Sequence, residues 1–166
     1  MIAVTRIAGI PLPSDDPVFL GLIVVHVGFG LAAVATGLVA MLSRKQRGRH
    51  PVFGTIYFWT LAGLFATMSA LSFLRWAEDS RLFMLGVPSF AAALWGRWNI
   101  RNRNPRRHLV GMGASYILML TAFYVDNGQN LPLWDRLPHV AYWIAPGAIG
   151  LPIIVWYLVR PPKFRF

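Results

Sequence analysis

Five long apolar segments constrain this 166-residue chain more than any other feature of its sequence. They cover residues 17–42, 52–74, 82–98, 109–125 and 139–159. About 20 apolar residues in a helix cross the hydrocarbon core of a bilayer. Only 13% of the residues are charged, against about a quarter in soluble domains. We therefore expect an all-α, polytopic membrane helix bundle of about five transmembrane helices, of which the third is short and contains Pro88.

The segments between the apolar runs differ sharply in charge. One set of connections carries basic residues: Arg44, Lys45, Arg47, Arg49, Arg97, Arg101, Arg103, Arg106, Arg107, Arg160, Lys163 and Arg165. The other set carries all six acids: Asp15, Asp16, Glu78, Asp79, Asp126 and Asp135. Such alternation follows the positive-inside rule. It predicts an external N-terminal segment (1–16), a bundle (17–160) and a cytoplasmic tail (161–166).

The same pattern explains the net charge of +10 without nucleic acid. A nucleic-acid surface would interleave basic and exposed aromatic side chains on a soluble face. Here the basic residues are mainly an orientation signal, so we expect no nucleic-acid partner. Juxtamembrane arginines are also attracted to anionic lipid headgroups, and Arg49, Arg106 and Arg107 are the candidates for such contacts.

His26 lies inside the first apolar segment, in "VVHVGFG". Gly30, Ala33, Gly37 and Ala40 follow it at helical spacing, so all five share one face. Small residues on one face let transmembrane helices approach closely, and Gly30, Ala33 and Gly37 are the expected packing residues. His26 would lie roughly 13 Å deep at 1.5 Å per residue.

At that depth an imidazole needs a hydrogen-bonding partner. We expect one on the fourth apolar segment, among Ser115, Tyr116, Tyr124 and Asp126. The simplest interpretation is a neutral imidazole in one interhelical hydrogen bond. Because ionisable residues inside membranes are often functional, His26 also remains a candidate single ligand of a haem-type or chlorophyll-type tetrapyrrole.

His50 and His108 precede the second and fourth apolar segments, and each follows arginine, in "RGRHPVFG" and "NPRRHLVGM". Three chemistries fit such a pair: axial ligation of a haem, an incomplete metal site, or an anion site shared with arginines. The alternative is that both histidines cap helix starts and contact headgroups. His139 is most simply an interface residue.

The stretches "HVGFGLAAVATG", "HPVFGTIY" and "HLVGMGASY" resemble a family of small bacterial inner-membrane proteins of unknown function. The resemblance covers roughly residues 20–125. By that likeness, seven positions match the family's recurring ones: His26, Gly37, His50, Gly54, Tyr57, His108 and Met112. Pro51 and Leu109 depart from the basic or aromatic residues common there. The resemblance implies a fold and a location but no mechanism.

The residue types leave few classes of function. The chain has no cysteine, and it shows no nucleophile–base pair, paired carboxylates or phosphate loop. We expect a non-catalytic accessory subunit packed against a larger membrane complex of respiratory or photosynthetic type. The alternative is a histidine-ligated membrane protein that carries haem or exchanges electrons with a quinone. A transporter is disfavoured by the odd number of spans and the lack of an inverted repeat.

Overall fold

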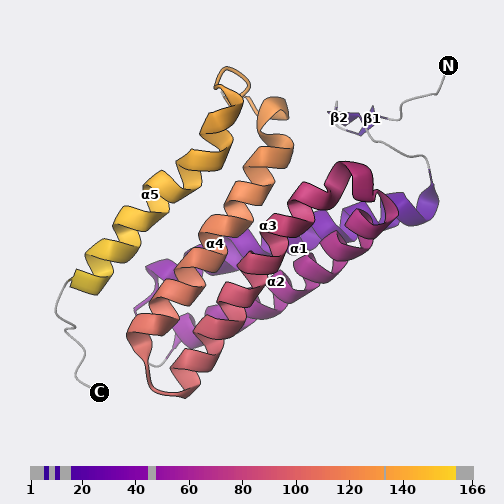
Figure 1. Ribbon diagram of the computed structural model, residues 1–166. Helices are drawn as coiled ribbons and strands as arrows, with labels where there is room; N and C mark the ends of the chain where they lie inside the picture. Colours follow the sequence, from indigo (N-terminus) through magenta and orange to yellow (C-terminus); the bar gives the residue numbers. More distant parts are fainter. Residues whose placement is uncertain (1–5, 8–9, 12–15, 45–47, 133, 160–166) are drawn as a thin grey trace. The chain divides into compact units, whose positions relative to one another are not determined.

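The computed structural model describes residues 6–7, 10–11, 16–44, 48–132 and 134–159 (Figure 1). The expected cytoplasmic tail and most of the N-terminal segment lie outside these ranges. The chain divides into two compact units, residues 1–84 and 85–166, and each is described by itself. The third helix runs through the boundary between them.

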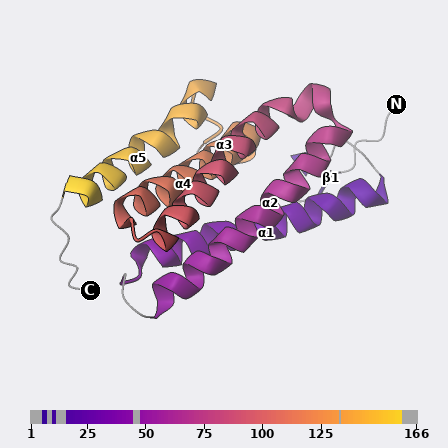
Figure 2. The same cartoon turned by 60° about the horizontal axis from the view of Figure 1, so that its bottom comes forward.

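The first unit is built on two long helices, α1 (Pro17–Leu42) and α2 (Arg49–Leu74). Figures 1 and 2 both show them side by side. The carboxylate of Asp16 begins α1 by accepting from the amide of Val18 at 2.9 Å, an N-cap that satisfies one free backbone donor. The only described strands, β1 (Arg6–Ile7) and β2 (Ile10–Pro11), form a short antiparallel hairpin before α1.

Small residues bring α1 and α2 together. Ala33, Gly37 and Ala40 are buried. A Cβ added to Gly30 would lie 3.6 Å from Leu64 of α2, and one added to Gly63 would overlap the ring of Phe29. The close approach gains dispersion contacts, which hold helices together where lipid offers no hydrophobic drive.

The corner after α2 is filled by aromatic rings and one ion pair. Phe73 stacks on Trp76, the first residue of α3 (Trp76–Arg101), with ring centroids 5.9 Å apart. Arg75, between the helices, pairs with Glu78 and lies over the ring of Phe19. Aromatic residues of this kind are typical of a helix end at a membrane–water interface.

In the second unit, α3 packs against α4 (Pro105–Asn127). The hydroxyl of Ser89 donates to the carbonyl oxygen of Ser115 at 2.9 Å, and both serines are buried. The two backbones come closest at Gly96 and Gly111. Asn104 caps α4, because its side-chain oxygen accepts from the amide of Arg107.

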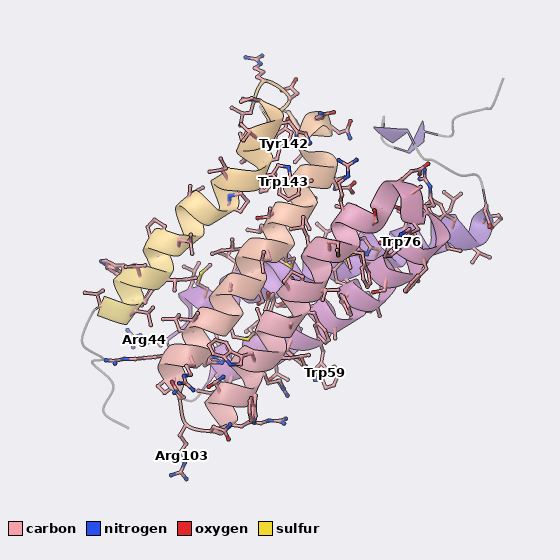
Figure 3. All side chains as sticks on the ribbon, viewed as in Figure 1. Arg44, Trp59, Trp76, Arg103, Tyr142 and Trp143 are labelled. Carbon is pink, nitrogen blue, oxygen red and sulfur yellow. The ribbon has the colours of Figure 1, made fainter. Side chains whose placement is uncertain are left out.

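The last helix, α5 (His139–Val159), lies beside α4 in both views. It follows a 3-10 turn, η1 (Gly128–Asn130), and a loop. Tyr142 is 1% exposed, and its ring lies against Gly128. Its hydroxyl donates to the carbonyl oxygen of Trp134 at 2.9 Å, which ties the loop to both helices (Figure 3).

The five α-helices of the described residues confirm the expected all-α membrane helix bundle. α1 and α5 begin and end as the sequence predicted, whereas α2, α3 and α4 extend beyond the apolar segments 52–74, 82–98 and 109–125. Hydropathy marks only the lipid-facing part of a helix, while caps and backbone hydrogen bonds set its ends.

Four helices of the described chain are long and apolar enough to cross a membrane: α1, α2, α4 with its 3-10 extension, and α5. α3 matches them in length but is more polar, since charged residues occupy both of its ends. Its middle, at Ser89, nevertheless lies against the middle of α4. We therefore expect α3 to cross the bilayer beside α4.

Candidate histidine sites

His26 bonds to the neighbouring helix of its own unit. Its Nδ1 lies 2.9 Å from the hydroxyl oxygen of Thr67 on α2. That hydroxyl also lies 3.0 Å from the carbonyl oxygens of Gly63 and Leu64. When the threonine proton is directed to one of these carbonyls, its oxygen accepts from Nδ1–H and the lone pair of the neutral ring is on Nε2.

The expectation that His26 bonds to Ser115, Tyr116, Tyr124 or Asp126 is wrong. Its partner, Thr67, lies on the helix that follows in sequence. The packing of α1 against α2 decides the partner of His26, because the face of α1 that carries His26 and the small residues contacts α2. Gly30, Ala33 and Gly37 lie one to three turns further along that same face.

His50 lies in the first turn of α2 and bonds back to α1. Its Nδ1 is 2.8 Å from the carbonyl oxygen of Ala40. The carbonyl oxygen only accepts, so Nδ1 carries a proton and donates it. Tyr57, two turns on and on the same face, is buried.

His108 repeats this arrangement in the second unit. It lies in the first turn of α4, and its Nδ1 is 2.9 Å from the carbonyl oxygen of Gly96 on α3. Met112 and Ser115, which share its face, also face α3: Met112 approaches Gly96, and Ser115 accepts from Ser89. Each unit thus fastens the start of one helix to the end of the preceding helix through a histidine.

Sequence reasoning missed this shared arrangement. The signal that could have found it is an Arg-His pair, at residues 49–50 and 107–108, that follows a small residue of the preceding helix. His50 comes 10 residues after Ala40, and His108 comes 12 residues after Gly96. Small residues at those positions leave room for the ring to reach a backbone carbonyl of the preceding helix. The spacing alone does not reveal which groups the ring bonds.

The remaining candidate residues lie on the surface of their units. Arg49, Arg106 and Arg107 are exposed next to the two histidines. His139 is exposed at the start of α5, with its ring edge-on to Tyr142 at a centroid distance of 5.5 Å. Within the described ranges, no three His, Asp or Glu side chains are grouped as metal ligands.

A family model described as "Predicted membrane protein (DUF2306)" matches residues 23–157. The chain belongs to this family. The match confirms the resemblance to membrane proteins of unknown function and extends it through the fifth helix. It also includes all three membrane histidines, His26, His50 and His108. No curated protein matches the chain, and no solved structure does.

Proposed function

We propose that this membrane protein is a non-catalytic subunit that packs against a larger membrane assembly through α1. The observation that carries the proposal is the open side of His26. Nδ1 is bonded to Thr67, the side chain is half-buried, and Nε2 is the acceptor of the ring when Nδ1 donates to the threonine. An acceptor without a donor is costly in hydrocarbon. A donor from a neighbouring transmembrane helix would satisfy it.

A second feature of α1 supports a helical neighbour. Gly21, Gly28 and Ala35 are exposed and spaced by seven residues, so they share one face. Gly28 belongs to this face, and Gly30 belongs to the face of α1 that packs against α2. Because the two glycines are two positions apart, the two faces lie about 200° apart around the helix. Nothing lies within 4 Å of a Cβ added to Gly21 or Gly28. A partner helix could approach closely there.

The test is the size of the particle after gentle extraction from the native membrane. We expect native electrophoresis to show one discrete complex with fixed partner stoichiometry. Gly28→Leu and His26→Phe should each release the chain from it, and Gly147→Leu, at an open glycine of α5, should not. Migration of the unaltered protein as a monomer would refute the proposal.

A second candidate function rests on the hydrogen bonds of His50 and His108. A bond from Nδ1–H to a backbone carbonyl is the orientation that metal-binding histidines commonly have in proteins. Each of the two histidines, within its own unit, would then be a ligand of a haem or a contact of a quinone. A bound haem would supply one-electron redox chemistry.

An absorption spectrum distinguishes the second candidate from the first. Protein made under haem-replete conditions should show a Soret band that His50→Ala combined with His108→Ala abolishes. His139→Ala should leave the band unchanged, since His139 lies exposed at the start of α5. A colourless preparation would refute the haem version.

A further inference from the structure

The turn between α3 and α4 concentrates positive charge. Arg101, Arg103, Arg106 and Arg107 fall within seven residues, and all four are exposed. Figure 3 shows Arg103 pointing away from the ribbon. The acids of the second unit are Asp126 and Asp135. Asp126 lies 19 residues beyond Arg107 on the same helix, about 28 Å away at 1.5 Å per residue.

The turn itself satisfies its own polar groups, so the arginines are not needed to hold it. The amide of Asn104 donates to the carbonyl oxygen of Asn99 at 2.9 Å. The amide of Arg103 donates to the carbonyl oxygen of Ile100 at 3.1 Å. The side chain of Asn99 is buried and donates to the carbonyl oxygen of Trp95. The arginine side chains are therefore available to bind something outside the unit.

Arg103 also occupies a backbone conformation that other residues adopt more easily. Its φ is 55°, in the left-handed region favoured by glycine and asparagine. An arginine there keeps a cation at the tip of the turn in spite of the backbone strain.

Two tryptophans on the last turns of α3, Trp95 and Trp98, are exposed, Trp98 by 64%. Exposed tryptophan marks the depth of lipid headgroups.

From this placement we infer that the α3–α4 turn binds the phosphate groups of anionic phospholipids. Guanidinium groups donate two parallel hydrogen bonds to phosphate oxygens, and the neighbouring tryptophans place the arginines at headgroup depth. Each arginine near an anionic surface strengthens binding by roughly fivefold. The inference does not depend on the proposed subunit role.

The test compares lipid classes on the full chain in mixed micelles. Quenching of tryptophan fluorescence by brominated phosphatidylglycerol and brominated phosphatidylcholine gives the relative association constant. We expect the native protein to prefer phosphatidylglycerol, and added sodium chloride to weaken that preference. Arg103→Gln combined with Arg106→Gln should lower it by roughly 25-fold. Arg103→Lys combined with Arg106→Lys should retain most of it, because lysine also binds phosphate.

The matched control is Arg81→Gln combined with Arg136→Gln, which removes two exposed arginines elsewhere and should leave the preference unchanged. Circular dichroism should show equal helix content in all variants, since the altered side chains are exposed. Equal selectivity of the native protein and the Arg103/Arg106 variant would overturn the inference. A second outcome would also overturn it. If inorganic phosphate abolishes the preference and sodium chloride of equal ionic strength does not, the turn is a site for free anions.

Discussion

Gly111 of α4 lies against Gly96 of α3 so closely that a Cβ added to Gly111 would be 2.6 Å from the Cα of Gly96. The same added atom would lie 2.7 Å from the carbonyl oxygen of Ala92. Both neighbours are backbone atoms, which cannot move aside as a flexible side chain can. One turn before Gly111, His108 bonds to the carbonyl oxygen of Gly96, so the contact and the hydrogen bond depend on the same approach of two helices.

Replacing Gly111 with alanine should destabilise the second unit. Overpacking of a close contact typically costs about 1–3 kcal/mol, and here the backbone of α3 must shift. The control is Gly147→Ala, where nothing lies within 4 Å of the added atom. Its better helix propensity should be neutral or stabilise by up to about 1 kcal/mol. Unfolding in mixed micelles of increasing sodium dodecyl sulfate measures both, and equal midpoints would contradict the packing described here.

Tyr142→Phe should lower stability by roughly 0.5–1.5 kcal/mol. The change keeps the ring against Gly128 but removes the hydroxyl that donates to the carbonyl oxygen of Trp134. Thermal unfolding of the variant beside the unaltered protein measures the loss. Cleavage of the loop before α5 by an added protease should also become faster in Tyr142→Phe.

Thr67→Val should lower the free energy of unfolding by about 1–3 kcal/mol, because it leaves Nδ1 of His26 without its hydrogen-bonding partner on α2. Thr60→Val is a close control. Thr60 bonds only to carbonyl oxygens of its own helix, at Ile56 and Tyr57, and those carbonyls keep their helical hydrogen bonds. If both variants unfold at the same denaturant concentration, the His26–Thr67 bond contributes nothing.

Single cysteines should reveal whether α3 crosses the membrane, since the native chain has none. We expect Ala77→Cys, at the start of α3, to react with an impermeant maleimide added outside intact cells. Asn102→Cys, just after α3, should react only after the cells are permeabilised, because a 26-residue helix spans about 39 Å. Equal labelling of both sites in intact cells would mean that α3 does not cross.

Much of the secondary structure followed from the sequence because it depends on local composition. Apolar length alone located α1 and α5 to the residue. The start of α2 and both ends of α3 and α4 were missed by two to six residues, since polar side chains continue these helices beyond the apolar run. No pattern in the sequence predicted the hairpin of β1 and β2, because two residues per strand are too few for an alternation of apolar and polar residues to be recognised.

The histidine sites show where local reasoning stops. The sequence indicated that His26 needs a partner, since its neighbours are apolar, but offered donors and acceptors on every helix. Choosing Thr67 over Ser115 required knowing that α1 packs on α2. Likewise, His50 and His108 were recognisable as a pair from the arginines before them. Their bonds to Ala40 and Gly96 were not, because backbone carbonyls carry no residue-specific signal.

The sequence by itself determined that this chain forms membrane-crossing helices, since that outcome depends on apolar length and on where the charges lie. It also determined which face of α1 is narrow enough for close packing. The tertiary structure alone decided the identity of the packing neighbours, the hydrogen-bonding partners of His26, His50 and His108, and the backbone contact at Gly96 and Gly111. Those features arise when separate helices meet, and helix periodicity constrains only the helix that carries it.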